Sequence, residues 1–244
     1  MVKLFCGSMY SGKSESLIRD LIKCTYAKKK ILFIRPYMDD RGYITHSRND
    51  SKVIKAINEK KIECIYIKEF DNATINDIIK EKYDVIFIDE FFMIKNNRNF
   101  LETLLICKAN TDIYYAGLIA DSDAHMFDEA IQILPLCDEI EKLNGVCTKC
   151  GSMLGNYSYH MGVKKNQIEV GDVKYECICG KCYFGEKKWW WIRIMKKQAE
   201  KILSLDSIWK NRDEKFKEMT IQIMANSLRY AENHNIKNKE IINL

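Results

Sequence analysis

The chain has 244 residues, of which 47% are hydrophobic and 30% are charged. This length and composition suit one buried α/β core with an appendage, or two modest domains, and they exclude collagen, a disordered chain and a coiled coil. The formal net charge of +5 suits an anionic ligand, but charge of this size does not by itself indicate nucleic acid.

Short aliphatic runs alternate with amphipathic stretches along the first half of the chain. Strands are expected within residues 2–6, 30–36, 62–70, 83–92 and 111–118, and helices from Ser14 onward, around 74–83 and near 98–109. The aliphatic runs are apolar without alternation, as in parallel strands that are buried on both faces. The pattern predicts an α/β fold with a mostly parallel sheet flanked by helices.

The texture of the sequence changes twice further along. Short alternating runs rich in Gly, Cys, Lys and Tyr follow residue 144, and amphipathic spacing such as Phe216, Met219 and Ile223 follows residue 187. We therefore expect a domain over residues 1–143, a small β module over 144–186 and a C-terminal helical extension over 187–244. The tryptophans at 189–191 are expected to pack on the protein or on another subunit, with a nucleic-acid stacking platform as the alternative.

The segment GSMYSGKS at residues 7–14 matches G-x-x-x-x-G-K-[ST] and lies between an expected strand and an expected helix. In a P-loop of this kind, backbone N–H groups and the helix N-terminus bind a phosphate chain. Lys13 is expected to reach the β- and γ-phosphates, and Ser14 to ligate Mg²⁺. The sequence thus predicts a P-loop NTPase-like domain whose ATP-binding residues are Gly7, Ser8, Met9, Tyr10, Ser11, Gly12, Lys13 and Ser14.

Two acidic residues follow the buried strand expected in VIFIDEFF. Asp89 is predicted to hold the metal or its water shell together with Ser14. Glu90 is placed to act as a base for an incoming hydroxyl or water, with a surface carboxylate as the alternative. After the second strand, Asp39 and Arg41 (with Arg48) are candidates to assist at the phosphates, and solvated loop charge is the alternative there.

Ten cysteines are distributed as six single residues and two close pairs, CTKC and CGKC, which are separated by 28 residues. This distribution favours a metal site over disulfides. Four thiolates on two C-x-x-C hooks suit a tetrahedral, structural Zn²⁺, so the predicted ligands are Cys147, Cys150, Cys179 and Cys182. Cys177 is a spare thiol or an alternate ligand. No apolar run reaches the roughly 18 residues of a membrane helix, and the first residues resemble a core strand, so we expect an untargeted cytosolic protein.

Several motifs in order resemble the cellular-type (type II) thymidine kinases over residues 2–183. They are GSMYSGKS, DDRGY…HSR, FIDEFF, AGL with a later Phe127, CDEIEKLNGVCTKCG and VGDVKYECICGKCY. The resemblance implies ATP-dependent phosphorylation of the 5′-hydroxyl of thymidine to dTMP, with Glu90 as general base. It also implies a base pocket lined by Met9, Leu118 and Phe127, a lasso loop between the hooks that contacts the nucleoside through Ile168 and Tyr175, and a homotetramer.

The chain departs from this family mainly around the expected nucleoside pocket. It has Phe92 and Met93 where the family usually carries Gln and an aromatic residue, and Ile119 and Ser122 where an Asp and a stacking Phe are usual. Three alternatives therefore remain beside a thymidine kinase. They are a kinase for another nucleoside, a P-loop ATPase with a nucleic-acid-binding zinc ribbon, and a silent nucleotide-binding subunit. The absence of further motor motifs makes nucleic acid an unexpected partner.

Overall fold

The computed structural model describes residues 1–38, 53, 55, 57, 59, 62–107, 110–161 and 175–186 of the chain. A compact unit spans Met1–Gly180, and a second unit spans Lys181–Leu244, of which residues 181–186 are described and helical. The predicted site residues Asp39, Arg41 and Ile168 lie outside the described residues. So do the two helices that the sequence predicts in the C-terminal extension.

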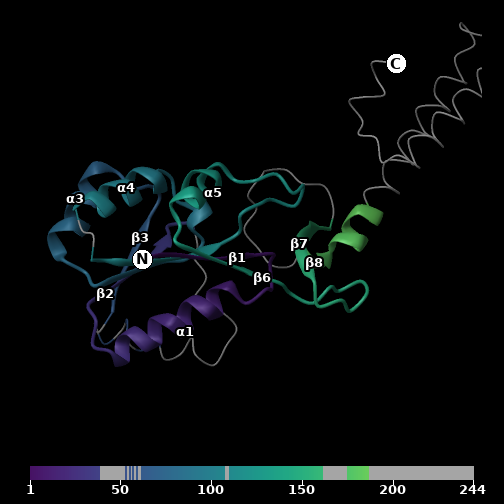
Figure 1. Ribbon diagram of the computed structural model, residues 1–244, viewed down its shortest axis with the longest axis horizontal. Coiled ribbons are helices and arrows are strands. Elements are labelled where there is room, and N and C mark those ends of the chain that lie inside the picture. Colours follow the sequence, from purple (N-terminus) through teal and green to yellow (C-terminus); the bar gives the residue numbers. More distant parts are fainter. Residues whose placement is uncertain are drawn as a thin grey trace, which may run out of the picture. The chain divides into compact units, whose positions relative to one another are not determined.

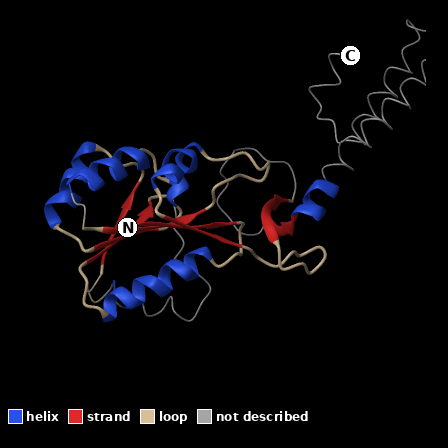
Figure 2. Cartoon of the chain, viewed as in Figure 1, coloured by secondary structure: helices blue, strands red, loops and turns tan. Residues whose placement is uncertain are grey.

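Six strands of the first unit form one sheet in which every pairing is parallel (Figures 1 and 2). Their order across the sheet is β3-β2-β4-β5-β1-β6. They are β1 (Val2–Gly7), β2 (Ile31–Pro36), β3 (Glu63–Ile67), β4 (Val85–Ile88), β5 (Asp112–Gly117) and β6 (Glu139–Leu143). Because the strands are parallel, their carboxyl ends meet at one edge of the sheet, where loops gather ligands in folds of this type.

Helices cover both faces of this sheet, as the sequence predicts. In Figure 1, α1 lies on one face and α3, α4 and α5 lie on the other. The elements are α1 (Lys13–Tyr26), α3 (Asn72–Glu81), the short helix η1 (Phe91–Met93), α4 (Asn97–Cys107), α5 (Asp128–Ile133) and the short helix η2 (Leu134–Leu136).

Two apolar cores result, one on each side of the sheet. On the α1 side, Leu17, Ile18 and Leu21 are fully buried against Phe5 and Phe87 of the strands. These helix positions recur at the i, i+1 and i+4 spacing of one helix face, as in an amphipathic helix that covers a sheet. The other core contains Leu4, Ile34 and Ile88 from the sheet together with residues of α3, α4 and α5.

A two-stranded antiparallel hairpin follows the sheet, within the residues where the sequence predicts a small β module. It consists of β7 (Gly155–His160) and β8 (Tyr175–Cys179). Strand β6, which pairs with β1 at the edge of the sheet, is not among the strands expected from the sequence. Among the described residues, no helix is long and apolar enough to span a bilayer.

Candidate active site

The predicted phosphate loop connects the carboxyl end of β1 to the start of α1. Gly12 directly precedes α1 with φ 83° and ψ 17°, a left-handed conformation that glycine adopts without strain. Gly7 has φ 154°, and the carbonyl oxygen of Leu143 occupies the place that a side chain would need. Ser11 folds back here, its Oγ 2.6 Å from that same place. Tyr10, at the outside of the turn, is 53% exposed. The loop thus requires glycine at position 7 for space and favours it at position 12 for its backbone conformation.

Lys13 and Ser14 begin α1 and face the end of β4. The Lys13 ammonium is buried and donates a hydrogen bond to the carbonyl oxygen of Ser8 at 2.7 Å. Burial lowers its pKa, while the nearby Glu90 and Asp89 carboxylates oppose that shift. The Ser14 hydroxyl donates to Asp89 Oδ1 at 3.0 Å. A hydroxyl and a carboxylate oxygen at this distance form a donor set that suits Mg²⁺, so these residues fit the predicted metal.

Asp89 and Glu90 stand at the carboxyl end of β4. Asp89 is fully buried, and its backbone N–H donates to the carbonyl oxygen of Ile34 at 3.0 Å, which continues the pairing with β2. Glu90 is half-buried and has φ 48° and ψ 42° at the start of η1. A non-glycine residue in this region is strained, and such residues cluster at functional sites. The chain turns sharply here, so successive carboxylates leave the strand in different directions.

Aromatic packing joins two of the residues expected around the acceptor. The Phe127 ring stacks on the Phe92 ring with centroids 4.7 Å apart and an interplanar angle of 25°. Both side chains are buried, and Leu118 packs against the same core cluster. Gly117 precedes Leu118, and a Cβ there would stand 2.8 Å from the Phe91 ring, so this end of β5 is tightly filled. The backbone N–H of Phe127 donates to the carbonyl oxygen of Ile119, the residue after Leu118, at 3.0 Å.

Met9 and Tyr175 are the other two described residues that are expected to bind the nucleoside. Met9 contacts the β7–β8 hairpin, and Tyr175 belongs to it. The backbone N–H of Met9 donates to Ser158 Oγ at 2.9 Å, which attaches the phosphate loop to β7. Tyr175 begins β8, and its ring meets the His160 ring edge-on with centroids 5.0 Å apart. Sequence reasoning missed Ser158, because a serine in a short alternating run carries no motif.

The segment that connects β5 to α5 contains a tight turn at Asp121. Asp121 Oδ1 accepts hydrogen bonds from the backbone N–H groups of Asp123 at 2.8 Å and His125 at 3.0 Å. Ser122 within this turn is buried, with 8% of its surface exposed. The sequence analysis had not assigned a role to Asp121, although an Asp at the start of a loop signals such a turn.

The two cysteine hooks come together as predicted. The sulfur atoms of Cys147, Cys150, Cys179 and Cys182 all lie within 4.8 Å of one another, and the Cys150 and Cys179 sulfurs are 3.7 Å apart. Tetrahedral zinc with bonds of about 2.3 Å places its sulfurs about 3.8 Å apart, so this set fits Zn²⁺. Burial of the Cys147 thiol opposes its ionisation, yet hydrogen bonds from neighbouring backbone N–H groups, that of Cys179 first, lower its pKa to about 6.

Cys177 is not part of the cluster. Its buried sulfur lies 3.2 Å from Ser8 Oγ in the phosphate loop. All ten cysteines lie within the described residues, and none of them forms a disulfide.

Comparison with known proteins agrees with this geometry. Residues 1–183 of the 244 match the sequence profile of the family described as "Thymidine kinase". The chain belongs to the thymidine kinase family. A thymidine kinase of rabbit fibroma virus is 31% identical over 188 residues, which cover 75% of this chain and 96% of the viral protein. A thymidine kinase of Bacteroides thetaiotaomicron is 28% identical over 187 residues, covering 75% of this chain and 86% of the bacterial protein.

Membership in the thymidine kinase family makes the chain an enzyme that transfers phosphate to a small nucleoside. The family match ends at residue 183, so it includes the phosphate loop, the acidic pair and both cysteine hooks. It also includes Phe92 and Ser122, two of the positions at which the sequence departs from the usual family pattern.

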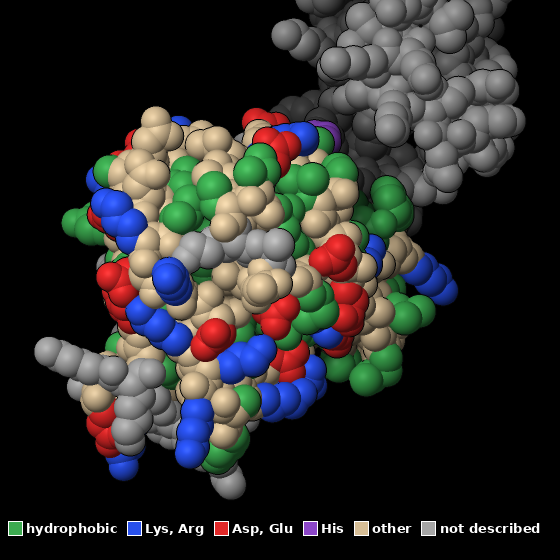
Figure 3. Space-filling view, turned by 60° about the vertical axis from the view of Figure 1, so that its left-hand side comes forward, with side chains coloured by type: hydrophobic (Ala, Val, Ile, Leu, Met, Phe, Trp, Pro, Cys, Tyr) green, Lys and Arg blue, Asp and Glu red, His purple; other side chains and the backbone are tan. Residues whose placement is uncertain are grey.

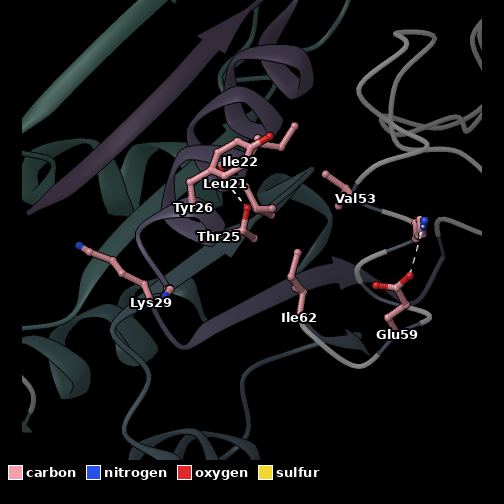
Figure 4. Close-up of a pocket in the computed structure, with 10 residues that line it drawn as sticks. Leu21, Ile22, Thr25, Tyr26, Lys29, Val53, Glu59 and Ile62 are labelled. Atoms are coloured by element: carbon pink, nitrogen blue, oxygen red, sulfur yellow. Dashed lines mark hydrogen bonds and ion pairs between the residues drawn. The ribbon is translucent and has the colours of Figure 1, made fainter.

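A groove elsewhere on this protein is separate from the residues described above. It has a volume of about 630 Å³ and lies beside the C-terminal half of α1, whereas the phosphate loop precedes the N-terminus of the same helix. Figure 4 shows Leu21 and Ile22 of α1 on one side of it, and Val53 and Ile62 on the other. Lys28 and Lys29 line its rim. No residue of the phosphate loop lines it, and neither Asp89 nor Glu90 does.

Surface charge also bears on the nucleic-acid alternative. On the described part of the face in Figure 3, Lys and Arg side chains are interspersed with Asp and Glu side chains. Nucleic-acid-binding domains usually gather basic residues into a patch or stripe. This face therefore does not favour a nucleic-acid partner.

Proposed function

We propose that this chain transfers the γ-phosphoryl group of ATP to the 5′-hydroxyl of thymidine, which yields dTMP and ADP. The observation that carries the proposal is the placement of Glu90. It follows Asp89 directly, turns away from the strand with φ 48°, and lies close enough to oppose the lowered pKa of Lys13. The Asp89 carboxylate accepts a hydrogen bond from Ser14, and Glu90 lies at the same edge of the sheet.

On this proposal the phosphate loop holds ATP. Backbone N–H groups between Gly7 and Gly12, together with the N-terminus of α1, bind the phosphate chain. The Lys13 ammonium, which contacts the Ser8 carbonyl in this structure, turns to the β- and γ-phosphates. Ser14 and Asp89 would hold Mg²⁺, whose charge offsets that of the phosphates.

The proton transfer is assigned to Glu90. Its carboxylate accepts the proton of the nucleoside 5′-hydroxyl as the oxygen bonds to the γ-phosphorus, and the bond from that phosphorus to the ADP oxygen breaks. Glu90 then loses the proton to solvent. A positioned general base of this kind contributes about 10²- to 10⁴-fold to rate. The chain's own groups thereby supply the base, the phosphate cradle and the positive charge.

The cysteine cluster has a structural role in this proposal. Cys147 and Cys150 precede β7, and Cys179 ends β8. Zn²⁺ bound by the cluster would therefore hold the start of β7 and the end of β8 together. Four protein ligands leave no open position for substrate. We therefore assign no chemical step to this metal.

The acceptor is the least constrained part of the proposal, and one observation favours a second candidate. Phe92, which replaces the usual Gln, stacks on Phe127, and Ser122 provides no ring at a position where the family usually stacks one on the base. A kinase for a different nucleoside is therefore the alternative function. Met9, Leu118, Phe127 and Tyr175 remain the proposed lining in either case.

A product assay tests the proposal. Purified protein is incubated with Mg-ATP and a panel of pyrimidine and purine nucleosides, and 5′-monophosphates are separated by chromatography. Thymidine is expected to give the largest kcat/KM. Glu90→Gln should lower kcat at least 10²-fold. The matched control is Glu102→Gln, whose carboxylate forms an exposed ion pair with Arg98 on α4 and should leave kcat unchanged. If no nucleoside yields a 5′-monophosphate, the proposal is rejected.

A further inference from the structure

Ser8 connects the phosphate loop to the β7–β8 hairpin. Its side chain is 3% exposed, and its hydroxyl donates a hydrogen bond to the Gly155 carbonyl at 2.9 Å. The same oxygen lies 3.2 Å from Cys177 Sγ, so the thiol is placed to donate to it. The carbonyl of Ser8 accepts the Lys13 ammonium. One residue therefore contacts both the hairpin and the lysine expected to bind phosphates.

Cys177 is attached in turn to the cysteine cluster. The backbone N–H of Thr148, which follows Cys147, donates to the Cys177 carbonyl at 2.9 Å. Cys177 also precedes the cluster residue Cys179 by two positions on β8. The thiol that reaches Ser8 is thus bracketed by two residues of the cluster.

Close packing fixes the position of this thiol. A Cβ on Gly155 would stand 2.5 Å from Cys177 Sγ, and a Cβ on Gly145 would stand 2.6 Å from it. Gly145 and Gly155 exchange backbone hydrogen bonds of 2.7 and 2.9 Å. The sulfur is therefore held between two backbone segments with no room to move aside.

A second link runs parallel to the first. The backbone N–H of Met9, the next residue of the loop, donates to the buried hydroxyl of Ser158 on β7. The links fix two consecutive residues of the phosphate loop to the hairpin, Ser8 to both of its strands and Met9 to β7. Any change in the geometry of the hairpin therefore changes the direction of the loop backbone.

We propose that Ser8 is a positioning residue that couples the cysteine cluster to the phosphate loop, so that metal bound by the cluster strengthens ATP binding at a site to which it contributes no ligand. This inference rests on the proposed function in one respect, that the loop binds the phosphates of ATP. By thermodynamic linkage, ATP must then strengthen metal binding by the same factor. Loss of a neutral hydrogen bond of this kind changes an equilibrium by roughly twofold to tenfold.

The reciprocal effect provides the test. Zinc-loaded protein is mixed with the chromophoric chelator 4-(2-pyridylazo)resorcinol, and the rate of zinc transfer is measured with and without Mg²⁺ and the non-hydrolysable analogue AMP-PNP. Because differences in affinity between related complexes appear mostly in the dissociation rate, we expect the analogue to slow zinc loss about fivefold in the natural chain. In Ser8→Ala the analogue should change the rate of zinc loss less than about twofold. The zinc content before mixing should stay at about one zinc per chain.

Two further variants control for a merely structural effect. Thr111→Val removes a buried hydroxyl that donates to the Tyr83 carbonyl at 3.0 Å. Thr111 lies at the amino end of β5, away from the phosphate loop at the carboxyl ends of the strands. This variant should keep the full effect of the analogue. Ser158→Ala removes only the second link and should reduce the effect in part; it also serves if Ser8→Ala does not fold.

The outcomes separate this inference from the proposed function. If Ser8→Ala responds to the analogue as the natural chain does, or if the analogue binds by calorimetry without slowing zinc loss, the coupling is wrong. If the analogue slows zinc loss but no nucleoside is phosphorylated, the coupling stands and the kinase proposal fails. If the analogue does not bind at all, both are rejected.

Discussion

We expect Glu90→Gly to abolish phosphoryl transfer without destabilising the fold. Glu90 has φ 48° and ψ 42°, a conformation that glycine adopts as readily as a right-handed one. The structure therefore holds a side chain at a position where the backbone alone favours glycine. If the side chain is retained for chemistry, removing it should improve local backbone energy and eliminate the reaction.

The expected size of the effect follows from two opposing contributions. A non-glycine residue in the left-handed region costs about 1–2 kcal/mol, and glycine gives back about 0.5–1 kcal/mol through its greater freedom in the unfolded chain. The net gain for Glu90→Gly is therefore between about 0 and 1.5 kcal/mol. Loss of a general base of 10²- to 10⁴-fold effect corresponds to about 3–5 kcal/mol in the barrier.

The reference for this measurement is Glu90→Gln, which also lacks the charge but keeps a side chain on the strained backbone. Both variants remove the attraction that opposes the lowered pKa of Lys13, so that effect cancels between them. Urea unfolding followed by circular dichroism gives the difference in stability, and steady-state kinetics with Mg-ATP gives kcat. We expect the glycine variant to be more stable than the glutamine variant by about 1 kcal/mol, with kcat reduced at least 10²-fold in both.

Either of two results would refute this reasoning. If Glu90→Gly is less stable than Glu90→Gln, the backbone at this position is not strained. If either variant keeps more than about a tenth of the natural kcat, Glu90 is not the general base.

Three further predictions concern other parts of the site. Gly7→Ala should lower stability by about 2–3 kcal/mol because a backbone carbonyl fills the side-chain space, whereas Gly12→Ala, with nothing within 4 Å, should lose only about 1 kcal/mol; equal urea midpoints would contradict this. Phe92→Gln should shift the ratio of kcat/KM between nucleosides, and an unchanged ratio would exclude Phe92 from selectivity. Cys150→Ser should lose the bound zinc in metal analysis while the control Cys24→Ser keeps it, and zinc retained by the first variant would contradict the ligand assignment.

The phosphate loop and the parallel sheet could be predicted from the sequence because each has a strong local signal. Buried parallel strands are apolar throughout, and GSMYSGKS combines glycines, lysine and serine at fixed spacing. The spacing of the two cysteine hooks was equally informative, and the structure brings all four sulfurs together.

Strand β6 could not be predicted because its sequence, EIEKL, reads as a charged surface segment. It is an edge strand, so polar residues are tolerated there. Lys3 of β1 forms ion pairs with Glu139 at 2.7 Å and Glu141 at 3.2 Å across the pairing. These charges stabilise the correct neighbour, which only the three-dimensional arrangement reveals.

Other features depend on contacts between distant residues. The left-handed turn at Glu90 and the stacking of Phe92 on Phe127 arise from packing at the end of β4, and no local pattern specifies them. Likewise, the Cys177 thiol contacts the phosphate loop and does not join the cysteine cluster. This contact depends on Ser8, which lies 169 positions away in the sequence. Sequence spacing alone left that cysteine ambiguous.

The position of β1 within the sheet has a consequence for biosynthesis. Strand β1 pairs with β5 and β6, so Val2–Gly7 lacks these partners until residues 113 and 139 have been synthesised. At ordinary translation rates this interval is on the order of 10 s, during which an apolar strand is exposed. The nascent chain therefore carries its phosphate loop in an unfinished state until β6 has been synthesised. Substitutions in β6 should consequently reduce the yield of soluble protein more than they reduce the activity of the molecules that fold.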